Sequence, residues 1–132
     1  MGDPGDMSDF PDRKVIVIVE DNEDIAELIK DTLNAEPDYQ AVAVNDGARA
    51  LEVINSVRAS LILLDVMLPG LDGLQIYDML KSDPDTNDVP VIFVTASEYR
   101  EEFRKRNIQR PVGKPFDLTE LLARVAEVCR PS

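Results

Sequence analysis

The sequence has no histidine, one cysteine and no apolar run longer than a β-strand. The lack of histidine excludes histidine-based catalysis, most transition-metal sites and a phosphohistidine on the chain itself. The single thiol, Cys129, cannot form an internal disulfide, and its place in an apolar helical pattern predicts that it is packed. The apolar runs are far shorter than the roughly 20 residues of a membrane-spanning helix. We therefore expect a soluble protein with no membrane partner.

Basic residues are also scarce, because 14 Lys and Arg stand against 26 Asp and Glu, a formal net charge of −12. This charge repels phosphate backbones and anionic lipids, so we expect no direct binding to nucleic acid. Residues 1–10 are acidic and contain glycine, unlike the basic and then apolar start of a signal peptide. The expected location is the cytoplasm. Clustered carboxylates in such a chain favour a hard metal ion.

The 132 residues are enough for one domain with its own core. Residues 1–13 are rich in Asp, Pro and Gly, so we predict a disordered leader there, or residues added for expression. The folded domain is predicted to span residues 14–132.

From Lys14 on, apolar runs of strand length alternate with amphipathic helical patterns. The runs at 15–19 and 61–64 are apolar without alternation, which predicts strands that are buried on both faces. Further strands are predicted at 39–44, 89–94 and 110–112. The segment 97–107 is mostly charged, which predicts a short, weakly held helix with a solvated face at 100–106. Helix N-caps are predicted at Asp21 or Asn22 and at Asp46. Capping boxes are predicted to pair Asp72 with Gln75 and Asp117 with Glu120. The apolar stripes of the helices, which include Leu28 and Met79, are assigned to the core.

Strands that alternate with helices about five times imply parallel βαβ units with helices on both faces. A chain this short suits a single doubly wound, flavodoxin-like α/β sheet of five strands in the order 2-1-3-4-5. Its switch point lies between the first and third strands. Ligands of such sheets bind at the carboxyl ends of the strands, and the chain has Glu20, Asp21, Asp65, Thr95 and Lys114 at or just after these ends.

Three carboxylates at one edge of a sheet repel one another by roughly 4 kcal/mol per close pair at an effective dielectric constant near 20. They need a cation, and Mg²⁺ suits oxygen ligands that leave room for a phosphoryl group. Asp21 and Asp65 would hold the ion, and a free oxygen of Asp65 would act as an in-line nucleophile. Lys114 and Thr95 would contact the transferred phosphoryl oxygens. The product of this chemistry is an aspartyl phosphate.

Four motifs carry a resemblance to a family: VIVIVEDNEDI, LLDVMLPGLDGL, VIFVTAS and VGKPF. In this order, and on these strand ends, they resemble the CheY-like receiver domain of two-component response regulators, from Lys14 to Cys129. The resemblance implies that Asp65 is phosphorylated, that Asp21 and Asp65 bind Mg²⁺ with the Met67 backbone carbonyl, and that Glu20 helps to hold the ion. It also implies that Thr95 and Lys114 bind the phosphoryl group, next to a Lys114–Pro115 bond that is often cis.

Two features depart from the family pattern. Receivers usually have an aromatic residue three positions before the lysine, where this chain has Pro111. The stretch from Thr95 to Lys114 is also shorter than expected. Both departures concern how the domain would change its surface after phosphorylation, and not the phosphorylation itself. A shortened, charged fourth helix could move as a unit in place of the usual aromatic side chain.

Each site residue also has a structural interpretation. Glu20, Asp21 and Asp65 could cap helices or lie in a solvated loop, the Thr95 hydroxyl could bond to backbone, and Lys114 could be a surface lysine. An aspartate-nucleophile phosphatase needs a second Asp two positions after the first, but that position is Met67. A phosphorylation-independent, receiver-like interaction module would share the fold and lack the site.

The sequence thus predicts a phosphoacceptor signalling domain rather than a turnover enzyme. It would take a phosphoryl group from a histidine kinase or histidine phosphotransfer protein onto Asp65 with Mg²⁺, lose it slowly, and change its surface in a phosphorelay. A single-domain regulator and the receiver part of a larger protein both remain open. So does a homodimer through the face formed by the fourth helix, fifth strand and fifth helix.

Overall fold

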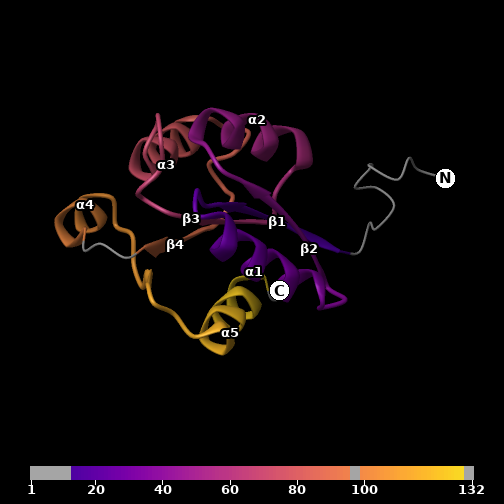
Figure 1. Cartoon of the computed structure of the whole chain (residues 1–132). Coiled ribbons are helices and arrows are strands. Elements are labelled where there is room, and N and C mark those ends of the chain that lie inside the picture. The colour runs from indigo at the N-terminus through magenta and orange to yellow at the C-terminus, as the bar shows by residue number, and fades with distance from the viewer. Residues whose placement is uncertain (1–12, 96–98, 130–132) are drawn as a thin grey trace.

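The computed structural model describes residues 13–95 and 99–129, so the predicted leader lies outside the described residues except for Arg13. A parallel sheet in the order β2-β1-β3-β4-β5 forms the middle layer, with helices on both faces (Figure 1). This confirms the predicted fold class and strand order. The elements are β1 (Lys14–Val19), α1 (Glu23–Asn34), β2 (Tyr39–Val44), α2 (Gly47–Val57), β3 (Leu61–Leu64), α3 (Gly73–Ser82), β4 (Val91–Thr95), α4 (Arg100–Lys105), β5 (Val112–Gly113) and α5 (Leu118–Cys129).

Successive side chains of β1 and β3 enter two separate cores. Ile16 and Ile18 of β1 pack in the core that includes Ile29 of α1 and Val125 of α5. The alternate β1 residues Val17 and Val19 pack in the core under α2 and α3. Figure 1 shows these helix pairs on opposite sides of the sheet. Strands β1 and β3 are therefore buried on both faces, as predicted.

Polar side chains cap the helices that follow the strands. The Asn22 side chain accepts from the amide of Ile25 at 3.1 Å, so Asn22 rather than Asp21 caps α1. Asp46 caps α2, and Asp72 with Gln75 forms the predicted capping box of α3. At α5 the prediction is wrong in detail, because the Asp117 carboxylate accepts from the amide of Thr119 and not from that of Glu120.

Two further predictions need correction. β4 begins at Val91 rather than at residue 89, because the Val89 amide donates to the carbonyl of Thr86 in the preceding turn. Leu28 and Met79 are exposed. The next residue in each helix, Ile29 after Leu28 and Leu80 after Met79, is buried instead and points toward the core. Cys129 is buried as predicted. Among the described residues, no helix is long and apolar enough to cross a bilayer.

Helix α4 depends on contacts outside itself, because six residues without a side-chain cap do not form a stable isolated helix. Phe103 is buried, with its ring centroid 4.9 Å from that of Phe93 in β4. Arg106 donates from Nε and Nη2 to the two carboxylate oxygens of Asp78 in α3, both at 2.8 Å, and from Nη1 to Glu102. With 22% of its side chain exposed, Arg106 does not belong to the predicted solvated face.

We expect Asp78→Asn to lower the free energy of unfolding by about 1 kcal/mol at pH 7, because it removes the charge of a bidentate ion pair near the surface. The hydrogen bonds from Arg106 hold the pKa of Asp78 below its usual value of 3.8. The contribution is therefore present above pH 3.8 and lost as pH falls through the lower pKa of the folded state. Urea titrations of both proteins between pH 7 and pH 3 measure this difference.

Glu101→Gln is the matched control, because it breaks an exposed ion pair with Arg104 within the same helix. Its expected effect is below about 0.5 kcal/mol. A difference between Asp78→Asn and the wild type that stays constant down to pH 3 would contradict the role of this ion pair.

Candidate phosphoryl-transfer site

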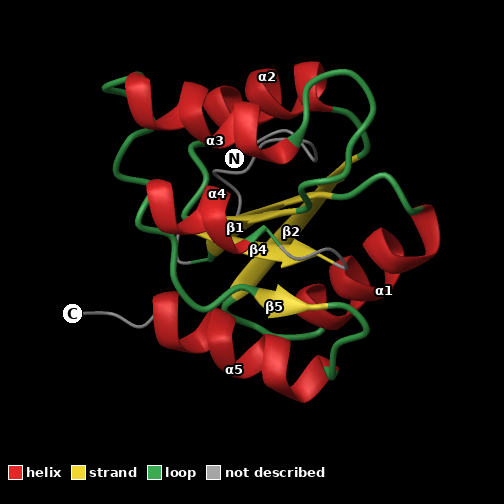
Figure 2. Cartoon of the chain, turned by 90° about the vertical axis from the view of Figure 1, so that its left-hand side faces the viewer, coloured by secondary structure: helices red, strands yellow, loops and turns green. Residues whose placement is uncertain are grey.

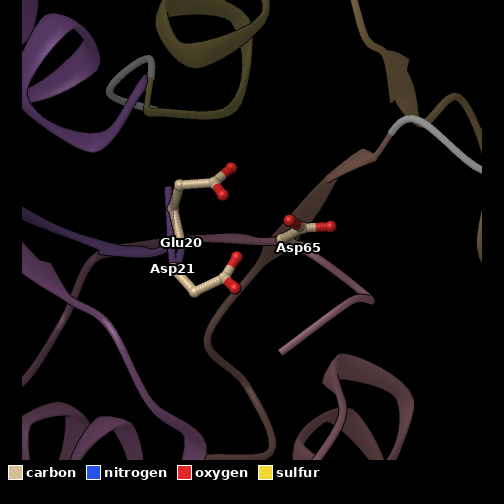
Figure 3. A group of neighbouring side chains, drawn as sticks. All are labelled: Glu20, Asp21 and Asp65. Atoms are coloured by element: carbon tan, nitrogen blue, oxygen red, sulfur yellow. The ribbon is translucent and has the colours of Figure 1, made fainter. Parts of the chain in front are cut away.

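Three acidic side chains meet at the carboxyl ends of β1 and β3 (Figure 3). Glu20 and Asp21 follow β1, and Asp65 follows β3. Carboxylate oxygens of all three lie within 4.8 Å of one another. Glu20 and Asp65 are only 2% and 5% exposed, whereas Asp21 is exposed. The cluster thus has two acids fixed in the protein and one that faces solvent.

Backbone hydrogen bonds hold the two buried acids. The amide of Glu20 donates to the carbonyl of Val44, and the amide of Asp65 donates to that of Val19, so the sheet ladder continues to the acids themselves. The Glu20 Oε2 atom accepts from the Asn22 amide at 3.1 Å. The Asp65 Oδ1 atom accepts from the Met67 amide at 3.1 Å. Neither acid caps a helix, so this structural alternative fails for Glu20 and Asp65.

Lys114 follows β5, at the edge of the sheet, and its side chain reaches both buried acids. Its ammonium Nζ donates to Glu20 Oε1 at 2.5 Å and to Asp65 Oδ2 at 3.0 Å. The lysine follows β5, and its amide donates to the carbonyl of Thr95 at 3.0 Å. The Lys114–Pro115 bond is cis, as the resemblance implied. Lys114 is therefore not the solvated surface lysine of the alternative interpretation.

Charges and burial act against each other in this cluster. Burial raises the pKa of Glu20, and the nearby Asp65 charge adds to this, while hydrogen bonds from Lys114 and Asn22 oppose it; the pKa lies above its usual value. Burial lowers the pKa of Lys114, but its hydrogen bonds to Glu20 and Asp65 outweigh burial, so that this pKa is raised. The ammonium thus stays charged and partly neutralises the buried acids.

Thr95 and Met67 lie at the border of the cluster. Thr95 ends β4, is buried, and pairs in register with Gly113 directly before Lys114. The last two positions of the VIFVTAS motif, 96 and 97, lie outside the described residues. Met67 has an exposed side chain, and its Sδ accepts from the Tyr99 hydroxyl at 3.0 Å. Sequence reasoning missed this contact, because residues 32 positions apart without a shared motif give no signal.

Gly73, the first residue of α3, is also required by this geometry and was not singled out from the sequence. A Cβ atom at this position would lie 2.2 Å from the Asp65 carbonyl oxygen and 2.8 Å from the Val66 Cα. The Gly73 amide donates to the Val66 carbonyl at 2.9 Å. Glycine therefore lets α3 approach the backbone of Asp65. The signal in the sequence is a glycine directly after a predicted N-cap.

Comparison with known proteins identifies the family. Residues 16–126 match the response regulator receiver domain. The chain belongs to this family. The receiver domain shares 38% identity over 119 residues with the phosphate regulon transcriptional regulatory protein PhoB of Klebsiella pneumoniae, which is 87% of this chain and 51% of PhoB. It shares 32% identity over 112 residues with the polar-differentiation response regulator DivK of Brucella anthropi, 83% of this chain and 90% of DivK.

The fold agrees with solved receiver structures. The phosphorylated cyanobacterial phytochrome response regulator RcpA superposes with a TM-score of 0.73 and 29% identity, over 88% of this chain and 91% of RcpA. The relatives differ in length, since this receiver domain spans about half of PhoB but most of DivK. Membership of the family therefore applies to the receiver domain, and the activity of a whole relative such as PhoB is not assigned to this chain.

Gly73→Ala is expected to lower the free energy of unfolding by about 2 kcal/mol, because the new methyl group overlaps backbone that has no room to yield. Equilibrium urea unfolding measures the loss. The control is Gly113→Ala in β5, where a Cβ would meet nothing within 4 Å. Equal stability of the Gly73→Ala variant and the wild type would show that α3 can move away from Asp65 freely.

Proposed function

We propose that Asp65 of this receiver domain accepts a phosphoryl group from the phosphohistidine of a histidine kinase or a histidine phosphotransfer protein. The observation that supports this most is the contact of the Lys114 ammonium with Asp65 and Glu20 inside a cluster of three carboxylates. A structural ion pair would need one acid for one lysine. A cluster with excess negative charge and one solvent-facing acid, Asp21, suits a site that receives a cation and a phosphoryl group.

In the proposed reaction a carboxylate oxygen of Asp65 attacks the phosphorus of the donor. A P–O bond to Asp65 forms as the P–N bond to the donor imidazole breaks, and the imidazole leaves with the electron pair of that bond. The hydrogen bonds of the Met67 amide and the Lys114 ammonium to Asp65 hold the carboxylate in a fixed orientation for this attack.

The donor set fits Mg²⁺, because all three side chains offer oxygen atoms, these lie close together, and one of the acids is open to solvent. We assign the ion to Glu20, Asp21, Asp65 and the backbone carbonyl of Met67. When bound, Mg²⁺ supplies the positive charge that offsets carboxylate repulsion and the charge of the incoming phosphoryl group. Glu20 shares its charge with Lys114, so its contribution to the ion is weaker than that of Asp21.

Lys114 and Thr95 are proposed to hold the phosphoryl oxygens after transfer. The Lys114 ammonium would exchange its bond to Asp65 for one to the phosphoryl group, and the Thr95 hydroxyl would add a hydrogen bond. The backbone hydrogen bond from the Lys114 amide to the Thr95 carbonyl would couple these two contacts with the phosphoryl group. The domain would act as a substrate that assists its own phosphorylation and slow hydrolysis, not as a turnover enzyme.

The proposed switch differs from one based on an aromatic side chain in β5, because Pro111 occupies the position three residues before Lys114. Helix α4 is the element that we expect to respond instead. It is short, uncapped by side chains, and begins five residues after Thr95. The relative RcpA has been solved in phosphorylated form, which supports phosphorylation as the trigger in this family.

Incubation with acetyl phosphate and Mg²⁺ is expected to add the mass of one phosphoryl group to the intact chain. Asp65→Asn removes the nucleophile and should abolish the gain, as should EDTA. Asp88→Asn makes the same chemical change at an exposed loop residue and should leave the gain intact. Intact-protein mass spectrometry reads all four samples. If the wild type gains no mass, the receiver-like interaction module without phosphorylation becomes the better account of this fold.

Asp21→Asn is expected to raise the Mg²⁺ concentration for half-maximal phosphorylation by at least about tenfold, because it removes a charged oxygen ligand from a site with few of them. Asp24→Asn, in the first turn of α1, has the same charge change outside the cluster and is the matched control. Phosphorylation by acetyl phosphate over a Mg²⁺ titration gives both values. An equal effect of the two substitutions would assign the metal dependence to general charge rather than to Asp21.

A further inference from the structure

Strand β2 forms one edge of the sheet, because within the described residues it pairs with β1 alone. The helices nearest to it, α1 and α2, lie on opposite faces of the sheet (Figure 1 and Figure 2). A groove of about 460 Å³ lies between them, and residues 42–45 of the strand and its end form part of its lining. We call it the edge groove. It leaves the outer side of β2 open between two helical walls.

Alternate residues of β2 direct their backbone groups away from β1. The Val44 carbonyl accepts from the Glu20 amide, so Val44 faces β1. Residues before and after it along an extended strand face the opposite way. The Ala41 amide agrees with this, because it donates to the Asn34 side chain at 2.8 Å and not to β1. The amide and carbonyl of Ala43 therefore point outward, and neither forms a hydrogen bond within the described residues.

The first part of the same edge is closed by the protein itself. The Tyr39 amide donates to the carbonyl of Glu36, and the Asn34 side chain occupies the amide of Ala41. An unpaired strand edge is a template for another strand, and proteins usually block it. Here the block stops before Ala43, where the edge groove begins. The open backbone groups thus coincide with the space that a further strand would need.

Side chains of β2 alternate between the two helical walls. Ala43 packs against the core that includes Ile29 of α1, and Val44 belongs to the core that includes Ile54 of α2. A strand added beside β2 continues this alternation, because neighbouring strands share one pleat. Its side chains would therefore point in turn to the α1 wall and to the α2 wall.

The two walls differ in chemistry. The α1 wall has the exposed carboxylates of Glu23 and Glu27, and Glu27 pairs with Lys30 of the same helix while 60% of its side chain stays exposed. An ion pair this exposed contributes at most about 1 kcal/mol, so a cation of a ligand can replace it at little cost. The α2 wall has Val53 and, further along, Arg49. The edge groove therefore suits a strand that is basic on one face and apolar on the other.

We propose that the edge groove binds an extended segment of a partner protein, which adds to the sheet beside β2. The segment forms backbone hydrogen bonds with the amide and carbonyl of Ala43. A Lys or Arg side chain of the segment contacts Glu23 and Glu27, and an apolar side chain on its other face lies over Val53. A second copy of β2 fits less well, because β2 has no basic residue to place against α1. Binding does not require phosphorylation of Asp65.

The test is selection of a random twelve-residue peptide library, displayed on phage, against the immobilised full chain. We expect the enriched peptides to have basic and apolar residues at alternate positions. Labelled synthetic copies then give dissociation constants by fluorescence anisotropy. Ala43→Pro removes the outward amide without removing a bond to β1, and should weaken binding at least about tenfold. Ala43→Ser keeps the amide and is the matched control, with an expected change below about twofold.

The charge of the α1 wall is tested by Glu27→Lys, which should weaken binding at least about fivefold. Glu120→Lys makes the same change on the exposed surface of α5, away from the edge groove, and is its control. All binding is measured without a phosphoryl donor, which keeps this test separate from that of Asp65.

Hydrogen exchange of the Ala43 amide, followed by NMR in the wild type, tests the backbone contact without any substitution. Bound peptide should slow this exchange at least about tenfold. Unchanged exchange, failure to enrich any peptide, or equal weakening by a variant and its control would overturn the proposal. A concentration-dependent dimer, seen by sedimentation and abolished by Ala43→Pro, would overturn it in favour of a second copy of the chain.

Discussion

The contact of one ammonium group with two buried carboxylates organises this molecule. Lys114 reaches Glu20 and Asp65 from β5, so that a single side chain connects the ends of three strands, β1, β3 and β5. Two carboxylates this deeply buried repel each other, and the ammonium of Lys114 offsets part of this repulsion. Asp21 adds a third acid that the lysine does not contact. The excess negative charge favours binding of a metal ion, which would in turn attract a phosphoryl group.

The rest of the fold holds these groups in place. Strands β1 and β3 pack in two cores at once, so a shift of either strand would disturb both cores. The backbone hydrogen bonds of the Glu20 and Asp65 amides extend this constraint one residue past the last residue of each strand. Gly73 extends the same constraint to α3, because the helix can approach Asp65 only without a Cβ atom. The acids are therefore set in a preformed arrangement, which suits a site that must align a nucleophile.

The sequence predicted the sheet order and the meeting of Glu20, Asp21, Asp65 and Lys114, because buried parallel strands have an unambiguous pattern and their carboxyl ends meet at one edge. It failed where the outcome depended on packing between distant residues. Leu28 and Met79 looked like core residues from spacing alone, yet neighbouring side chains took the inward positions. Arg106 looked like part of a charged surface, but its partner Asp78 lies 28 residues earlier, and no local pattern reveals such a pair.

Helix α4 shows how one short element can serve two purposes. On its inner side, Phe103 and Arg106 attach it to the core and to α3, and these contacts replace the stability that six residues cannot supply. On its outer side, Arg100 and Arg104 remain at the surface beside an apolar groove. Few contacts hold the helix, so the proposed change at Thr95 and Lys114, which lie on either side of α4 in the sequence, would need little free energy to shift it.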